Sequence, residues 1–104
     1  RSTLFPYTTL FRSALAQGLA VITKKYAMGA NGKTVIEDLG RGYIKLIADA
    51  DSHILLGAQL MCGRATDLVG ELALAISNKL TLEDISSTIH PHPTFVEAIA
   101  EAAR

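Results

Sequence analysis

The sequence predicts an α+β domain in which helices pack on one face of an antiparallel sheet. Segments with strand-like alternation come first in the chain, and segments with helical spacing of apolar residues follow them. Strands that precede helices in this way are typical of α+β domains. The length of 104 residues fits one small domain, and a hydrophobic content of 49% is enough for a core.

Three segments are predicted to be strands. Residues 19–26 are rich in β-branched and aromatic side chains, which favour strands. Residues 43–48 and 54–61 are apolar segments separated by a polar turn at residues 49–53. Two such segments across a short turn are expected to pair as an antiparallel hairpin.

Alternation of side chains along the hairpin predicts its core face. We expect this face to carry Ile44, Leu46 and Ala48 from the first strand, and Leu56, Ala58 and Leu60 from the second. Ahead of the hairpin, residues 29–32 carry a turn signal, and residues 34–37 are expected to form a short extended piece.

The second half of the chain is predicted to be helical. Residues 65–79 place apolar side chains at helical spacing. Residues 81–84 (Thr-Leu-Glu-Asp) have the form of a capping box and should open a short helix that ends near Ser87. Residues 94–97 (Thr-Phe-Val-Glu) are a second capping box, in which Thr94 would cap a last helix that ends at residue 103.

The first thirteen residues are expected to be foreign to the domain. Residues 1–13 (RSTLFPYTTLFRS) show no helical or strand period, and they resemble the conceptual translation of a sequencing-library adapter along their full length. We therefore predict that residues 1–13 are a non-native segment. Residues 14–104 would then be the natural domain, truncated on its N-terminal side. A natural N-terminal arm is the alternative.

Composition argues against two classes of partner. Ten basic and ten acidic residues give a formal net charge of +0, whereas a general nucleic-acid binder carries a basic excess. No apolar run approaches the ~18–20 residues of a membrane span. The single cysteine, Cys62, is compatible with a reducing compartment. We therefore expect a cytoplasmic protein that binds neither nucleic acid nor membrane.

Three motifs are better explained by structure than by chemistry. Residues 27–34 fit a relaxed phosphate-loop pattern, but no helix of useful length is expected after Thr34, so a loop between strands is favoured. His90 and His92 suggest a metal pair, yet no third ligand stands at ligand spacing, and we expect no metal. Cys62 lies in apolar surroundings and is expected to be an inert thiol.

The informative cluster is His90-Pro-His92-Pro-Thr-Phe-Val-Glu97. His92 comes just before the start of the last predicted helix and Glu97 lies in its first turn, so both side chains can occupy the same helix end. A carboxylate beside a histidine fixes one ring nitrogen as a donor and leaves the other as a base. The alternative is a simple capping box next to a loop histidine, and the residues alone leave both open.

At this point the sequence resembles the C-terminal dimerisation domain of dihydrolipoamide dehydrogenases, in the class I pyridine nucleotide-disulfide oxidoreductase family. The ending HPHPTFVEAIAEAAR is similar to the family signature of His-x-His-Pro-Thr followed two residues later by Glu. The segments GANGK, GYIKLIADADSHILLGAQLMCGRATDLVGELALAI and LTLEDISSTIHPHPT extend the resemblance over residues 15–104.

The resemblance implies roles for four residues. His92 matches the family's catalytic base, which acts in the active site of the opposite subunit of a homodimer, and Glu97 matches its orienting carboxylate. The His92–Pro93 bond matches a cis bond whose backbone lies close to the partner's flavin, so His92 and Pro93 are also expected to contact the cofactor. His90 is expected to be supporting or structural.

The resemblance also implies FAD and NAD as cofactors of the whole enzyme and a lipoyl-bearing protein of a 2-oxoacid dehydrogenase complex as its partner. This chain holds no Cys-x4-Cys pair and no Gly-x-Gly-x-x-Gly fingerprint, so the fragment alone is not expected to bind FAD or to be active. A sister reductase that acts on glutathione or a metal ion, and a dimerisation module without catalysis, are the alternatives.

Overall fold

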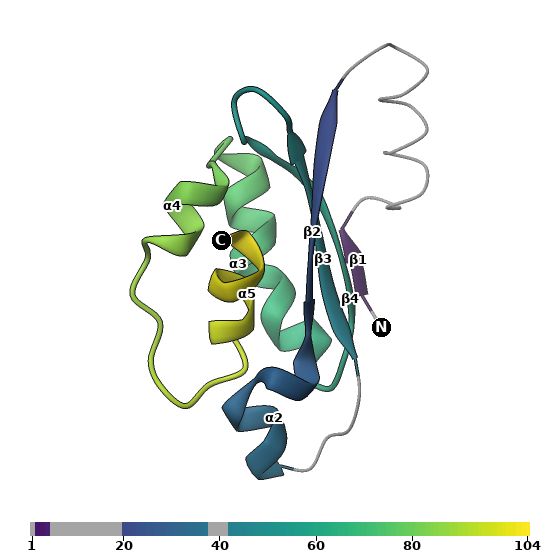
Figure 1. Ribbon diagram of the computed structural model, residues 1–104, viewed down its shortest axis with the longest axis vertical. Coiled ribbons are helices and arrows are strands. Elements are labelled where there is room, and N and C mark those ends of the chain that lie inside the picture. The colour runs from purple at the N-terminus through teal and green to yellow at the C-terminus, as the bar shows by residue number, and fades with distance from the viewer. Residues whose placement is uncertain (1, 5–19, 38–41) are drawn as a thin grey trace.

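The protein is a small sheet covered by helices, seen in a computed structural model that describes residues 2–4, 20–37 and 42–104 (Figure 1). In chain order the elements are β1 (Ser2–Leu4), β2 (Val21–Ala27), the 3-10 helix η1 (Met28–Ala30), α2 (Gly32–Glu37), β3 (Tyr43–Asp49), β4 (Leu55–Met61), α3 (Ala65–Ser77), α4 (Leu82–Ser86) and α5 (Glu97–Ala103).

The four strands form one antiparallel sheet in the order β1-β4-β3-β2. β2 pairs with β3 from Val21 opposite Asp49 to Ala27 opposite Tyr43. β3 and β4 form the expected hairpin across the polar turn. The hairpin is therefore confirmed, and so is the strand predicted at residues 19–26, which the structure shows as Val21–Ala27; residue 19 lies outside the described residues. β1 lies inside the segment expected to be foreign, and its origin stays a prediction.

The core face of β4 differs from the prediction at one position. The register of β3 and β4 shifts between Ile47, which lies opposite Gly57, and Ala48, which lies opposite Leu55. Leu56 is therefore an extra residue in β4, and such a bulge breaks strict alternation. As a result Leu55 joins the core, 1% exposed, and the expected Leu56 does not.

Helices α3, α4 and α5 all lie on one side of the sheet, as Figure 1 shows. The core between the two layers contains Leu46 and Leu60 from the sheet, Leu72 from α3 and Ile99 from α5, each 0% exposed. The predicted α+β class is therefore confirmed. Within the described ranges, no helix has the length and apolar character that crossing a bilayer requires.

The segment after β2 is helical, which corrects the expected extended piece at residues 34–37. α2 runs from Gly32 to Glu37 because Asn31 caps it: its side-chain Oδ1 accepts the Thr34 backbone N–H at 2.9 Å. A side-chain acceptor at this position satisfies a backbone donor that the first helical turn would otherwise leave free. The cap therefore starts a helix where the sequence predicted a short extended piece.

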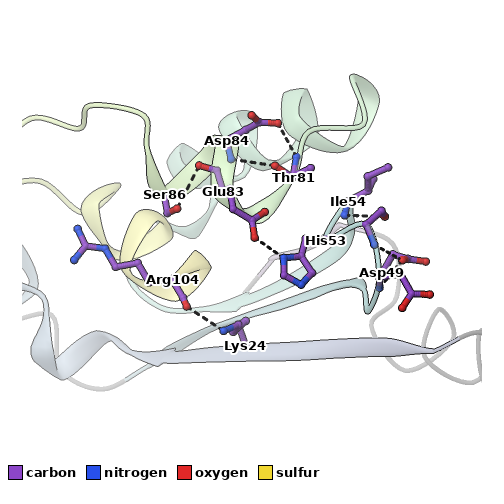
Figure 2. Close-up of polar contacts among 11 residues, drawn as sticks. Lys24, Asp49, His53, Ile54, Thr81, Glu83, Asp84, Ser86 and Arg104 are labelled. Carbon is purple, nitrogen blue, oxygen red and sulfur yellow. Dashed lines mark hydrogen bonds and ion pairs between the residues drawn. The ribbon is translucent and has the colours of Figure 1, made fainter.

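The start of α4 follows the sequence pattern. The Thr81 hydroxyl accepts the Asp84 backbone N–H at 3.1 Å, and the Asp84 carboxylate accepts the Thr81 N–H at 2.9 Å, so the predicted capping box is complete (Figure 2). Nearby, His53 in the hairpin turn contacts the Glu83 carboxylate. This contact fastens α4 to the end of the sheet.

Candidate active site around His92 and Glu97

The loop between α4 and α5 brings His92 against Glu97, as the sequence predicted. The His92 ring nitrogen Nδ1 lies 2.9 Å from Glu97 Oε1 and 3.0 Å from Oε2. The imidazole is 77% exposed, whereas the Glu97 side chain is 29% exposed. The His92–Pro93 peptide bond is cis. Glu97 is therefore partly buried at the protein surface, and the His92 ring projects from the surface towards solvent.

The start of α5 corrects the expected capping arrangement. The Thr94 hydroxyl donates to the Pro91 carbonyl at 2.6 Å, so Thr94 does not cap the helix, and α5 begins at Glu97. Only the acidic half of the box forms, in which Glu97 Oε1 accepts the Thr94 backbone N–H at 2.9 Å. One oxygen of Glu97 thus holds both the backbone of the loop and the ring of His92.

These two contacts determine the electrostatics of Glu97. The Thr94 backbone N–H, followed by the His92 ring, lowers the pKa of Glu97 below its ordinary 4.5, although partial desolvation opposes this. Hydrogen bonds to a carboxylate stabilise its charged form. Glu97 is therefore an ionised acceptor at neutral pH, and Nδ1 of His92 must carry the proton of the bond that joins them.

This lowered pKa predicts a pH-dependent stability. A group whose folded pKa lies below its unfolded value stabilises the fold above the unfolded value, and the stabilisation is lost as the pH falls through the folded pKa. We expect the free energy of unfolding of wild type to exceed that of Glu97→Gln at pH 7, and the difference to shrink below pH 4.5. Urea unfolding at a series of pH values measures it. A difference that does not vary with pH would contradict the assignment.

The second ring nitrogen of His92 is the chemically available one. With a proton on Nδ1, the neutral ring presents a lone pair at Nε2, and Nε2 makes no hydrogen bond to any residue within the described ranges. A ring that is oriented by an acid and free at its other nitrogen can accept a proton from a bound thiol or hydroxyl. The geometry therefore supports a general base that acts on something outside this chain.

A cavity of about 250 Å³ opens beside the pair. Its wall combines residues from three parts of the chain: Tyr26, Ala30, Asn31, Gly32, His92, Glu97 and Glu101. Burial, and then the charges of Glu101 and Glu97, raise the pKa of Tyr26. Its phenol therefore remains a neutral donor in this wall. No local pattern indicated that Tyr26 belongs to this wall, because the charges that act on it, Glu97 and Glu101, come from helix α5.

His90 fastens the loop to α3. Its ring is 5% exposed, its Nδ1 donates to the Thr88 carbonyl at 2.9 Å, and its Nε2 lies 2.9 Å from the Glu71 carboxylate. This agrees with the expected supporting role. His90 and His92 each face a different glutamate rather than a shared point. Among the described residues, no group of three or more histidine, cysteine or acidic side chains could hold a metal ion.

The contacts of the phosphate-loop pattern at residues 27–34 and of Cys62 indicate structural roles for both. A six-residue helix, α2, occupies the place where a loop between strands was favoured. Lys33 is paired with Glu37 at 3.0 Å, and both the Thr34 N–H and its hydroxyl donate to Asn31. The Lys33 and Thr34 donors of this pattern are therefore engaged within the chain. Cys62 is partly buried and burial raises the pKa of its thiol, which disfavours the reactive thiolate.

Comparison with known proteins assigns the chain to one family. Residues 11–103 match the model described as "Pyridine nucleotide-disulphide oxidoreductase, dimerisation domain". Dihydrolipoyl dehydrogenases from Halobacterium salinarum and Bacillus subtilis are 43% and 39% identical over 90 residues, which is 86% of this chain. The match covers 19% of each relative, so the chain spans about a fifth of their length.

Solved structures agree on the fold. LpdA from Mycobacterium tuberculosis superimposes on 89% of this chain with a TM-score of 0.81 at 20% identity, over 20% of its own length. The HOCl-induced flavoprotein disulfide reductase RclA from Escherichia coli superimposes on 88% with a TM-score of 0.82, also at 20% identity, over 21% of its length. Together with the family match, these findings show that the chain belongs to the dimerisation-domain family of the pyridine nucleotide-disulphide oxidoreductases.

Proposed function

We propose that this chain is the dimerisation domain of a dihydrolipoyl dehydrogenase and that His92, oriented by Glu97, is the base that it supplies to the active site of the partner subunit. One observation carries the proposal: an imidazole that is 77% exposed is held at Nδ1 by an ionised acid, with Nε2 directed away from the contact. A side chain in this arrangement can accept a proton from a substrate that is bound by the partner subunit. The relatives named dihydrolipoyl dehydrogenase support the choice of substrate.

The proposed step is removal of a proton from a thiol of the substrate. His92 Nε2 accepts this proton, and the thiolate attacks a disulfide of the partner subunit. This attack forms a mixed disulfide and releases one sulfur of the partner subunit's disulfide as a thiolate. The second substrate thiol loses its proton and displaces the other sulfur, which closes the lipoyl disulfide and leaves the partner subunit's pair reduced. The substrate has then lost two protons and two electrons, and the two electrons pass on to NAD⁺, which becomes NADH with release of one proton. Glu97 stabilises the positive ring that forms when Nε2 is protonated, because its carboxylate remains ionised.

FAD is the group that the family implies between the disulfide and NAD, and it would supply the electron carrier there. The residues of this chain fit a contributing role, since His92 and Pro93 are both exposed at the tip of the loop. Their surface can approach a flavin that the partner subunit binds. We infer that His92 and Pro93 form this contact in a cytoplasmic homodimer that serves a lipoyl-bearing protein. Residues 14–104 are proposed as the natural part of the chain.

The experiment is an assay of the complete oxidoreductase subunit that carries this domain. We expect NAD⁺ reduction with dihydrolipoamide to exceed that with reduced glutathione at equal concentration of thiol groups. Activity that prefers glutathione would assign the chain to a sister reductase. No dithiol-dependent activity in a flavin-loaded dimer would indicate a module without catalysis and would reject the proposal.

A further inference from the structure

Asn31 connects the start of α2 to the loop that carries His92. It is 3% exposed, and both ends of its amide are used. Nδ2 donates to the Thr94 carbonyl at 3.0 Å, across 63 positions of sequence, while Oδ1 accepts the Thr34 N–H at 2.9 Å and the Thr34 hydroxyl at 3.0 Å. An amide is required here because one atom must donate and the other must accept.

Thr94 is the residue through which this contact reaches the candidate base. Its carbonyl accepts from Asn31, its N–H donates to Glu97, and its hydroxyl donates to Pro91. The peptide units on either side of Thr94 are thus held in place by two side chains. Because Glu97 Oε1 accepts from both Thr94 and His92, a shift of Thr94 moves the acid that orients the ring.

Gly32, the residue after Asn31, lies close to the His92 ring. A methyl group built on Gly32 would lie 3.9 Å from His92 Cε1, which is ordinary van der Waals contact. The beginning of α2 therefore lies directly beside the imidazole. Asn31 joins this helix start to the loop that carries the ring, through its hydrogen bond to the Thr94 carbonyl.

We propose that Asn31 is a positioning residue for the His92–Glu97 pair, acting through its hydrogen bond to the Thr94 carbonyl. This inference rests on the proposed function, because it assigns a role within the same site. Asn31 is 3% exposed, so its route to the base runs through the Thr94 carbonyl. Its effect is on the alignment of the base, and a misplacement of about 1 Å is enough to slow a proton transfer many-fold.

Three variants of the complete enzyme separate this role from helix capping. Asn31→Ser and Asn31→Asp both keep an acceptor for the Thr34 N–H, and serine and aspartate are good caps. The aspartate carboxylate has no proton to donate to the Thr94 carbonyl, and the serine hydroxyl ends one bond short of the Nδ2 atom that makes this contact. Thr34→Val is the matched control, since it removes a hydrogen bond from the same amide and leaves the Asn31–Thr94 contact intact.

The measurements are kcat and KM for dihydrolipoamide, and the ratio of kcat in H₂O to kcat in D₂O. We expect Asn31→Ser and Asn31→Asp to lower kcat about tenfold with KM little changed, and to raise the solvent isotope ratio, because proton transfer to a misaligned base becomes slower. The isotope ratio does not depend on the fraction of active enzyme. Thr34→Val should match wild type in all three quantities.

Two results would overturn this inference alone. One is a wild-type kcat and isotope ratio for Asn31→Ser while His92→Gln is impaired. The other is an equal loss in Thr34→Val, which would assign the effect to the stability of α2. Unimpaired turnover in His92→Gln would instead reject the proposed function and the inference with it.

Discussion

Replacement of His92 by glutamine is expected to reduce dithiol-dependent NAD⁺ reduction by about 10²–10⁴-fold, the usual contribution of a general base. Glutamine preserves a polar side chain of similar reach but cannot accept a proton at neutral pH. The loss should appear mainly in kcat, because the ring is a surface side chain whose removal leaves the fold unchanged. Steady-state rates in the complete enzyme, normalised to bound flavin, measure it.

The chain contains a matched control for this substitution. His53 also contacts a glutamate, Glu83, and its side chain is 39% exposed, but it lies in the hairpin turn against α4 (Figure 2). His53→Gln removes the same type of pair outside the candidate site and should leave turnover within about twofold of wild type, since surface pairs contribute little. Equal losses in the two variants would show that His92 has no special role in the reaction.

Substitution of Gly42 by alanine is expected to produce the largest loss of stability, about 3 kcal/mol, at the upper end of the usual cost of overpacking. A Cβ at this position would lie 2.2 Å from the Met61 carbonyl oxygen and 2.9 Å from Cys62 Cα. Both are backbone atoms, so no side-chain rotation can relieve the overlap. The Gly42 carbonyl also accepts the Met28 N–H at 2.9 Å, so a displaced Gly42 weakens the connection after β2 as well.

Gly70 provides the opposite control. It lies inside α3, and nothing stands within 4 Å of a Cβ added there. Gly70→Ala should therefore stabilise the domain by about 0.5–1 kcal/mol, because alanine loses less conformational entropy in a helix. Urea unfolding of the two variants compares them directly. A Gly42→Ala variant as stable as wild type would show that the hairpin end can open without cost.

Local patterns predicted the parts of the fold that depend on neighbouring residues. The spacing in residues 65–79 located α3, and the Thr81–Asp84 box located α4, because caps and helical faces are encoded within a few positions. The His92–Glu97 contact was predicted for the same reason, since five positions separate its partners. α2 was missed although Asn31 stands at cap spacing from Thr34, because no helix of useful length was expected after Thr34.

Contacts between distant segments were outside the reach of sequence patterns. The Leu55–Leu56 register depends on how β3 lies against β4, and alternation alone assigns the wrong leucine to the core. Asn31 reaches Thr94 across 63 positions, and His90 reaches Glu71 on another helix. The structure was therefore required to find the residues that support the pair, whereas the pair itself could be found from the sequence.

Glu97 Oε1 contacts both the His92 ring and the Thr94 backbone N–H, and this limits which substitutions of Glu97 preserve the base. In an isosteric glutamine the amide oxygen can still accept the Thr94 N–H, which leaves an NH₂ group facing His92. That group donates to Nδ1 and selects the inverted tautomer, with hydrogen on Nε2. Glu97→Gln would thus leave the shape of the loop intact and still convert His92 Nε2 from a proton acceptor into a donor. The ring could then no longer act as a base at that atom.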